Sequence, residues 1–156
     1  CHSDQALRML AEPSRAERDI LGAIGYASND VVLHTDTRLL PKRRRAWASW
    51  NYRLGGPSEQ LAAVTYNMNI LQGIDSPETF CVSLNQTDAI DPDQILARFT
   101  YDHPQYSLAG IAAHARADEL LGAHHSYFCG AYWGNGFHED GVVSALRVAG
   151  AFGESL

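Results

Sequence analysis

The chain has 156 residues, 46% of them hydrophobic, and a formal net charge of −6. This length and composition suffice for one domain with a substantial core. The acidic balance argues against general nucleic-acid binding, so the basic run 42–45 is interpreted as a solvated hairpin turn. No apolar run approaches the roughly 18 residues of a membrane span and no signal-peptide pattern is visible, so we expect a soluble, cytoplasmic protein without membrane contact.

Two helices are predicted at the start of the chain. The first covers about residues 3–11 and ends before Pro13. The second begins after Ser14, because Glu17 three residues later completes a capping box, and it stops at Gly22. The chain begins without an initiator Met, which we interpret as the sign of a fragment of a larger protein.

Four runs rich in β-branched and aromatic residues come next, separated by Pro, Gly and charged turns. We expect them to form consecutive strands of an antiparallel meander. In the second run, alternate side chains would face a core and a partner layer or cavity. The runs cover residues 30–35, 46–53, 62–69 and 80–85.

Two more helices are predicted after the meander. Asp91 and Pro92 supply a cap and a first-turn proline for a short helix that continues through the apolar side chains of residues 95–99. A longer helix over about residues 107–121 would end at Gly122. Together with the strands, these helices indicate one α+β unit in which helices flank an antiparallel sheet. The inward side of the longer helix would carry Ile111, Ala112, Ala115 and Leu120.

The last thirty residues combine a strand-like run at 126–129, a glycine loop at 130–136 and a closing helix that begins with acidic residues. Because glycine has no Cβ, such a junction lets backbone approach a ligand closely, and the first-turn N–H groups of the helix favour an anion or an electron-rich planar ring. The small, apolar composition after Gly141 predicts a helix buried on most sides. The other interpretation is an ordinary closing helix packed behind a strand.

Cysteine and histidine patterns give no metal or disulfide signature. Two of the three cysteines lie in apolar, strand-like runs, which favours buried thiols in a reducing compartment. Adjacent His124 and His125 would point to opposite faces of a strand, and neither H-x-x-x-H nor C-x-x-C occurs, so we expect no metal site. The cysteines are Cys1, Cys81 and Cys129.

The closing segment carries a family resemblance. Phe128-Cys129-Gly130-Ala131, followed by Gly141-Val142-Val143-Ser144-Ala145, resembles the end of flavin-containing amine oxidases and related FAD-dependent oxidoreductases, which read roughly F-A-G-E, a glycine loop and a G-A-x-x-S-G helix. Other segments resemble a bacterial branch of NAD/FAD-binding, amine-oxidase-like proteins. They lie at 2–7, 33–36, 46–52, 64–69, 101–104 and 136–141.

This resemblance implies the C-terminal part of an FAD-dependent oxidoreductase that transfers hydride from an organic substrate to FAD. Residues of about 29–123 would form the substrate layer, and about 124–156 the last strand and helix of the FAD layer. The chain has no G-x-G-x-x-G motif, so sequence outside it would hold the adenosine half, and the fragment alone would be inactive.

The resemblance also implies contacts to the flavin ring. Backbone N–H groups near Asp140, Gly141 and Val142 would face N1 and C2=O, while Tyr132 and Trp133 would pack on the ring. Ala131 stands where many relatives have an acid, which puts ribityl contacts there in doubt. The complete expected cofactor set is Gly130, Ala131, Tyr132, Trp133, His138, Asp140, Gly141 and Val142.

For the substrate, Trp50 and Tyr66 are the expected pair, because aromatic side chains on strands facing a flavin could sandwich a small organic molecule. Polar meander residues could line the same cavity, but a solvent-exposed face is favoured for each of them. The alternative function is a non-catalytic interaction domain without a cofactor. Apolar surface left by truncation would favour a homodimer. The polar residues are His34, Asp36, Asn51, Tyr66, Asn67 and Asn69.

Overall fold

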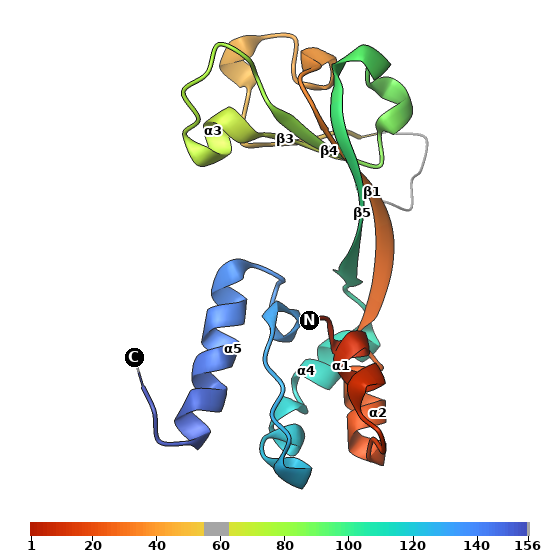
Figure 1. Ribbon diagram of the computed structural model, residues 1–156, viewed down its shortest axis with the longest axis vertical. Helices are drawn as coiled ribbons and strands as arrows, with labels where there is room; N and C mark the ends of the chain where they lie inside the picture. The colour runs from red at the N-terminus through yellow and green to blue at the C-terminus, as the bar shows by residue number, and fades with distance from the viewer. Residues whose placement is uncertain (55–62, 156) are drawn as a thin grey trace. The chain divides into compact units, whose positions relative to one another are not determined.

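The computed structural model describes residues 1–54 and 63–155. The chain forms two compact units, one from residues 1–27 and 104–156 and the other from residues 28–103. The first is helical and the second contains most of the sheet (Figure 1). This division falls at 27/28 and 103/104, whereas the expected internal boundary lay near residue 123.

In the described residues, the helical unit contains four α-helices, with three 3-10 turns between the last two of them. The predicted N-terminal pair is confirmed, and so is the capping box between them: the Glu17 N–H donates to Ser14 Oγ over 3.2 Å, and the Ser14 N–H to Glu17 Oε2 over 2.6 Å. No described helix is long and apolar enough to cross a bilayer. The α-helices are α1 Ser3–Met9, α2 Arg15–Leu21, α4 Leu108–His114 and α5 His138–Ala151; the turns are η5 Ala117–Leu120, η6 Ala123–His125 and η7 Ala131–Trp133.

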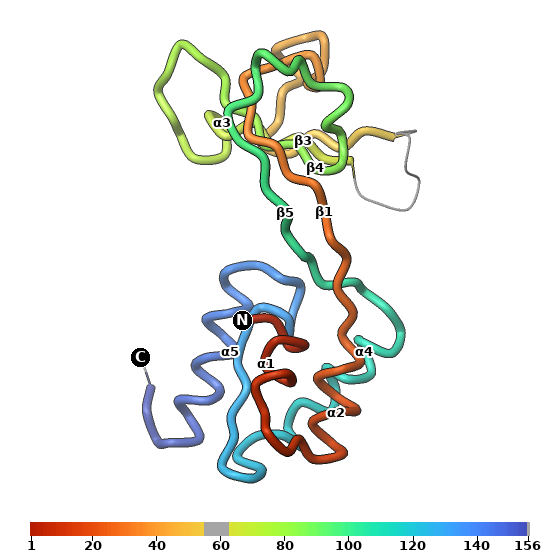
Figure 2. Tube along the Cα trace, turned by 45° about the vertical axis from the view of Figure 1, so that its right-hand side comes forward, coloured from red at the N-terminus to blue at the C-terminus, as the bar shows by residue number. Residues whose placement is uncertain are grey.

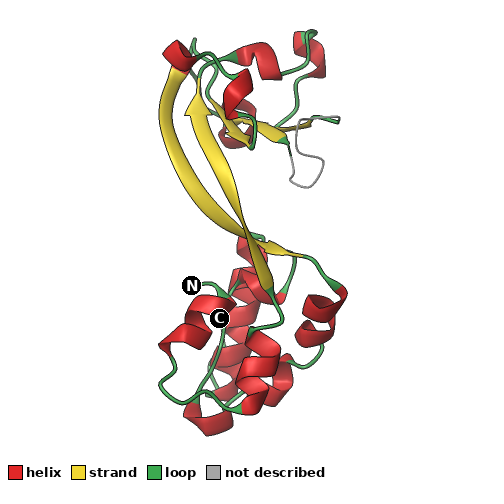
Figure 3. Ribbon diagram, turned by 90° about the vertical axis from the view of Figure 1, so that its right-hand side faces the viewer, coloured by secondary structure: helices red, strands yellow, loops and turns green. Residues whose placement is uncertain are grey.

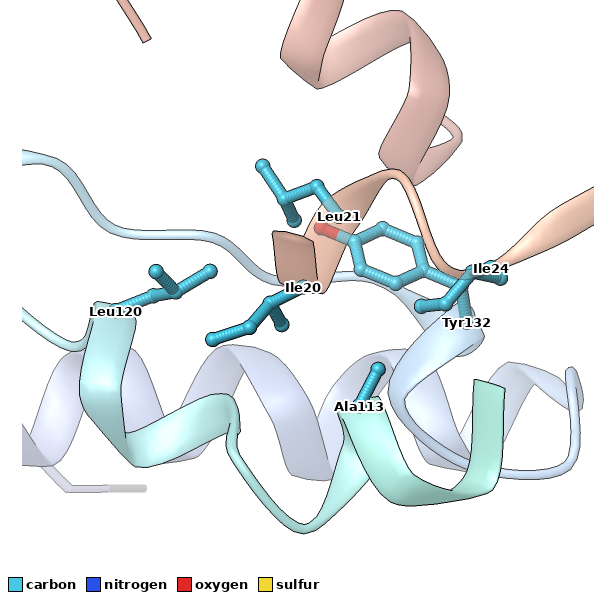
Figure 4. Close-up of a cluster of buried hydrophobic side chains, with 6 residues drawn as sticks. All are labelled: Ile20, Leu21, Ile24, Ala113, Leu120 and Tyr132. Carbon is cyan, nitrogen blue, oxygen red and sulfur yellow. The ribbon is translucent and has the colours of Figure 1, made fainter. Parts of the chain in front are cut away.

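The core of this unit forms where the end of α2 meets α4, η5 and the loop after residue 130. Ile20 and Leu21 are fully buried there, and the ring of Tyr132 lies beside them (Figure 4). The remaining members of the cluster are Ile24, Ala113 and Leu120.

The helix predicted over 107–121 is interrupted. The helix begins where it was expected, with Ser107 as its cap accepting the Gly110 N–H over 3.0 Å, but α4 ends at His114 and a 3-10 turn follows. The buried face is also rotated from the expected one, because Gly110 and Ala113 face inward while Ile111 is exposed. A Cβ at Gly110 would lie 3.8 Å from the Ala23 carbonyl oxygen, which is van der Waals contact. The helix therefore packs through the face that carries its small residues, Gly110 and Ala113.

The sheet has the strand order β2-β3-β4-β1-β5, and the pairs β2/β3, β3/β4 and β4/β1 are antiparallel. Its strands are the yellow arrows of Figure 3. The predicted meander is therefore confirmed for its last three strands. The first predicted strand is displaced: β1 pairs with β4 and lies next to β5, a neighbour that the Cα trace also shows (Figure 2). The strands are β1 Gly25–His34, β2 Trp50–Tyr52, β3 Val64–Asn67, β4 Cys81–Leu84 and β5 Ile95–Gln105.

The short helix predicted from Asp91 is wrong. Asp91 and Pro92 cap only a single 3-10 turn, η4 Pro92–Gln94, in which Asp91 Oδ1 accepts the Asp93 N–H over 3.1 Å. Residues 95–105 are then a long strand. The β-branched and aromatic residues of this segment favour an extended backbone, and β1 provides a partner strand that no local pattern could reveal.

Candidate functional site

The segment before the glycine loop is extended but is not a strand. Its polar groups contact the loop and the last helix: the Trp133 indole N–H donates to the Phe128 carbonyl over 2.9 Å, and the Gly130 N–H to Ser144 Oγ over 2.8 Å. Ser144 is the only buried residue among the described residues of α5. The predicted strand at 126–129 is therefore replaced by a segment held through side chains.

Two glycines in the loop are required by the loop's own packing. A Cβ at Gly130 would lie 2.4 Å from Cε1 of Tyr132, and a Cβ at Gly134 would lie 2.4 Å from Oδ1 of Asp140. Gly136 has a left-handed backbone with φ of 84°, which glycine adopts without steric cost. The loop is thus closely packed around one aromatic ring and one carboxylate.

Asp140 organises the turn into α5. Its Oδ2 accepts the N–H of Asn135 over 3.0 Å and the N–H of Phe137 over 2.9 Å. A carboxylate in the first helical turn also interacts favourably with the positive end of the helix. The side chain of Asp140 therefore stabilises the loop. Its backbone N–H is one of the first three of the helix, which have no carbonyl acceptor within the helix.

Gly141 differs from the other two glycines. Its N–H donates to the Phe137 carbonyl over 3.3 Å, so it belongs to the helical hydrogen-bond ladder, as does that of Val142 by helix geometry. The first-turn N–H groups that can face a ligand are those of residues 138–140, so their centre lies two residues before the expected centre at Gly141. A Cβ at Gly141 would meet nothing closer than Ala131 N at 3.8 Å, an ordinary contact distance.

The aromatic pair in the loop serves the core. Tyr132 is 5% exposed and belongs to the buried cluster, and burial raises the pKa of its hydroxyl. Trp133 packs beside it, with ring centroids 5.1 Å apart, and lies edge-on to the His114 ring at 6.3 Å. The expected ring-stacking role of Tyr132 does not fit this burial, because its face is already covered by core side chains.

The closing helix is far more exposed than the sequence predicted. His138 and Glu139 in its first turn are exposed, and so are Val142, at 46%, and Val143, at 56%. The expectation of burial on most sides is wrong for the described residues, since only the Ser144 side packs on the loop. This leaves an accessible small and apolar surface beside the first turn.

The expected substrate pair lies in the other unit, on the sheet. Trp50 and Tyr66 are directly opposite each other on β2 and β3, with ring centroids 5.4 Å apart and planes at 71°. Trp50 is 53% exposed, whereas Tyr66 is half-buried and burial raises its pKa. The pair presents an accessible indole face on an edge strand supported by an edge-to-face contact.

The opposite face of the sheet contains a polar network that sequence reasoning missed. His34 Nε2 lies 2.8 Å from Ser83 Oγ, which lies 2.7 Å from Thr65 Oγ1, and all three residues are buried. A solvent-exposed face was favoured for His34, Asp36 and Asn67, and this expectation is wrong. The available signal was three pairs of polar residues two positions apart, in or just after neighbouring strands: His34 and Asp36, Thr65 and Asn67, and Ser83 and Asn85.

Burial explains the electrostatics of this network. Desolvation lowers the pKa of His34, and the nearby Asp36 opposes that shift. His34 Nδ1 is buried without a hydrogen-bond partner among the described residues. The network is enclosed, so its Ser–His contact has no access to a substrate and stabilises the sheet unit instead.

Asp36, two residues after His34, connects this part of the sheet to the loops that contain Arg38 and Asp91. It is 1% exposed and accepts the Arg38 and Asp91 backbone N–H groups over 2.9 and 2.8 Å, together with the Arg38 guanidinium over 2.6 Å. The Arg38 hydrogen bonds, followed by those from backbone, hold the pKa of Asp36 far below its usual range.

Cysteine and histidine positions correct two further expectations. All three cysteines are free; Cys81 is buried, which raises its pKa to about 11, but Cys129 is exposed. His124 and His125 both have left-handed backbone in a 3-10 turn, and neither lies in a strand. In residues 1–54 and 63–155, no group of three or more His, Cys, Asp or Glu side chains could hold a metal ion.

The structure thus assembles the two expected sets separately. The loop and helix residues from Gly130 to Val142 lie together in the helical unit, and Trp50 and Tyr66 lie together in the sheet unit. Comparisons of the chain with protein-family models and with curated protein sequences find no match.

Proposed function

We propose that this chain supplies the flavin-ring contacts and the substrate layer of an FAD-dependent oxidoreductase of the amine-oxidase type. The proposal rests on the resemblance of residues 128–131 and 141–145 to the closing motif of those enzymes. The observation that supports it best is the environment of Gly141. FAD, when bound, accepts a hydride equivalent from a C–N or C–C bond of an organic substrate.

Gly141 stands in the fourth position of a regular helix, where glycine costs about 0.5 to 1 kcal/mol relative to alanine. The chain's own packing does not account for it, because an added Cβ would meet only ordinary contacts. Gly130 and Gly134, by contrast, are explained by Tyr132 and Asp140. A planar group that approaches the helix start closely would account for glycine at 141.

The residues around Gly141 fit the ring end of a flavin. The backbone N–H groups of residues 138–140 provide donors for ring oxygen and nitrogen atoms. The exposed Val142 provides apolar contact, and Asp140 holds the preceding loop in place through Asn135 and Phe137. Tyr132 and Trp133 support this loop from the core side.

On the substrate side, the exposed indole of Trp50, supported by Tyr66, fits an organic molecule with an apolar or cationic portion. This covers the amine class that the resemblance implies. We assign Trp50 the contact and Tyr66 the support, because Tyr66 is the more buried of the two.

The test is a visible absorption spectrum of the protein purified from its complete reading frame, beside that of this 156-residue chain. We expect flavin bands in the longer protein, their loss in Gly141→Leu, and their retention in Gly150→Leu. Gly150 lies near the end of the same helix, and a Cβ there would meet nothing within 4 Å. A colourless protein that does not take up added FAD would overturn the proposal.

A second candidate function is an interaction domain without a cofactor. The exposed Val142, Val143 and Leu146 on α5 favour it, because a protein partner could cover this surface equally well. The same variants separate the two functions. Loss of FAD in Gly141→Leu without a change in sedimentation favours the flavoenzyme, whereas concentration-dependent association that Val143→Glu abolishes, in a colourless protein, favours the interaction domain.

A further inference from the structure

The sheet unit concentrates positive charge in one segment of an acidic chain. Six of the twelve Lys and Arg residues lie between positions 38 and 53, and no Asp or Glu does. The chain as a whole has a formal charge of −6. Such a local excess creates a positive potential that attracts anions over about one Debye length. The cations are Arg38, Lys42, Arg43, Arg44, Arg45 and Arg53.

Residues of this segment line a surface pocket of about 370 Å³. Arg38, Lys42 and Arg53 line it together with Tyr52 and the apolar residues Leu40 and Pro41, and none of the lining residues that the structure describes is acidic. Pockets of this size accommodate small organic ligands. The lining thus combines cations with a flat aromatic surface.

The backbone that presents these cations is held in place by specific contacts. The Trp47 indole N–H donates to the Pro41 carbonyl over 2.8 Å, and the Arg44 guanidinium lies 5.2 Å from the Trp47 ring. On the other wall, the Asn51 amide donates to the Ala48 carbonyl over 2.7 Å. Arg44 and Arg45 of the basic run therefore lie in a 3-10 turn, η2 Arg44–Ala46, and not in the hairpin turn that the sequence suggested.

The cations of the pocket differ in availability. Arg38 donates to Asp36 and lies 3.7 Å from an Asp91 oxygen, so most of its charge is compensated. Lys42 and Arg53 make no ion pair within the described part of the chain. These two side chains are free to meet an incoming anion.

We propose that this pocket binds an organic phosphate of the nucleoside-diphosphate class. Arg and Lys side chains are the usual partners of phosphate oxygens, and Lys42 and Arg53 provide two such groups. Tyr52, which is 63% exposed, provides a surface on which a base can stack. Leu40 and Pro41 provide apolar contact beside it.

Isothermal titration of the 156-residue chain with ADP, pyrophosphate and adenosine tests the proposal. We expect ADP to bind with a Kd below about 1 mM, pyrophosphate about tenfold more weakly, and adenosine more weakly still. Raising the salt concentration should weaken ADP binding, because charge attraction contributes to it. The absence of saturable ADP binding would overturn the proposal, and so would ADP that binds no more tightly than pyrophosphate.

Single substitutions locate the binding. Lys42→Gln and Arg53→Gln should each weaken ADP binding by about fivefold to tenfold, and Tyr52→Ala by a similar factor. The matched control is Arg98→Gln, an exposed arginine of β5 outside the pocket lining. Equal weakening in this control would indicate a general charge effect and overturn the site.

Two further measurements distinguish this pocket from a site in the helical unit and from a nucleic-acid surface. Gly141→Leu should leave ADP affinity unchanged, since the pocket does not involve the proposed flavin contacts; a matching loss would assign ADP binding to the helical unit and overturn the pocket. Tighter binding of a single-stranded RNA oligomer than of ADP, lost in the same variants, would identify a nucleic-acid surface instead.

Discussion

Asp36 in the sheet unit and Asp140 in the helical unit each organise a loop, and the surroundings of the two carboxylates differ. Asp36 in the sheet unit is fully buried and receives hydrogen bonds from a guanidinium and from two backbone N–H groups. Asp140 in the helical unit is half-buried, and its hydrogen bonds come from the backbone N–H groups of Asn135 and Phe137. Both carboxylates fix a turn, but among the residues that the structure describes only Asp36 has a cationic partner.

This difference shows how burial decides what a loop-holding carboxylate does. A carboxylate removed from water needs a counter-charge and a full set of donors, so the Asp36 turn becomes part of the core of its unit. A carboxylate near the surface needs neither, and the turn that it holds can remain accessible. The Asp140 turn is therefore the better place for ligand contacts, and the Asp36 turn is the better foundation for a neighbouring pocket.

The largest expected effect comes from removing the buried carboxylate's charge. Asp36→Ala should reduce the free energy of unfolding by about 3 kcal/mol, because the Arg38 guanidinium and two partly buried N–H groups lose their acceptor. Urea unfolding followed by far-UV circular dichroism measures this. Asp75→Ala, at an exposed position of the same unit, should change stability by less than about 0.5 kcal/mol. A similar small change in Asp36→Ala would contradict the comparison.

The second effect tests how tightly the Asp140 turn is packed. Gly134→Ala should destabilise the protein by about 2 kcal/mol, because its Cβ would lie 2.4 Å from Oδ1 and 2.8 Å from Cβ of Asp140. Gly150→Ala, in open space on α5, should instead stabilise it by up to about 1 kcal/mol. Thermal unfolding of both variants gives the sign of each change, and stabilisation in both would show that Asp140 moves aside easily.

The parts of the fold that local chemistry determines could be predicted from the sequence. The Ser14–Glu17 capping box and the end of α2 at Gly22 depend on residues within one turn of one another, and both are found. The meander from β2 to β4 is also found, since each strand pairs with the next one along the chain.

The sequence predictions are wrong where contacts between segments distant in the sequence determine the structure. Asp91 and Pro92 form the expected cap, yet the residues after them pair beside β1 as β5. Likewise, alternation alone could not tell that His34 faces Ser83 across the sheet and is closed off from solvent. Hydrophobic pattern indicates which side of a strand is polar, but not which other chain segments cover that side.

The candidate site shows the same division. The glycine loop and the start of α5 at acidic residues could be predicted directly, because these features are contiguous in the sequence. The inward position of Tyr132, the exposed side of α5 and the compensation of Arg38 by Asp36 depend on packing between segments. Those positions decide which side chains remain available to a ligand.

The third effect concerns the surface carboxylate itself. Asp140→Ala should cost about 1 kcal/mol, as the loss of a helix cap does, and should increase amide hydrogen exchange at Asn135 and Phe137. Asp140→Asn keeps an acceptor oxygen and should restore part of the protection. Glu139→Ala, in the same turn but exposed, should leave both amides unchanged. Exchange at the two amides that is the same in wild type and Asp140→Ala would remove the organising role from Asp140.

The smallest effect is a pH dependence that distinguishes the buried network from the surface turn. Desolvation makes the folded-state pKa of His34 lower than its ordinary value of about 6.5, so the unfolded chain binds a proton more readily than the folded one. The stabilisation that neutral His34 provides is therefore present above pH of about 6.5 and is lost as pH falls from there through the folded pKa. Urea midpoints between pH 8 and pH 5 should fall for wild type and for His138→Gln, an exposed control, and fall less for His34→Gln. Nε2 of His34 contacts Ser83, and the Asp36 charge opposes the pKa shift of His34. An equal fall of the urea midpoint in all three proteins would mean that carboxylates, and not the His34 imidazole, govern the acid response of the sheet unit.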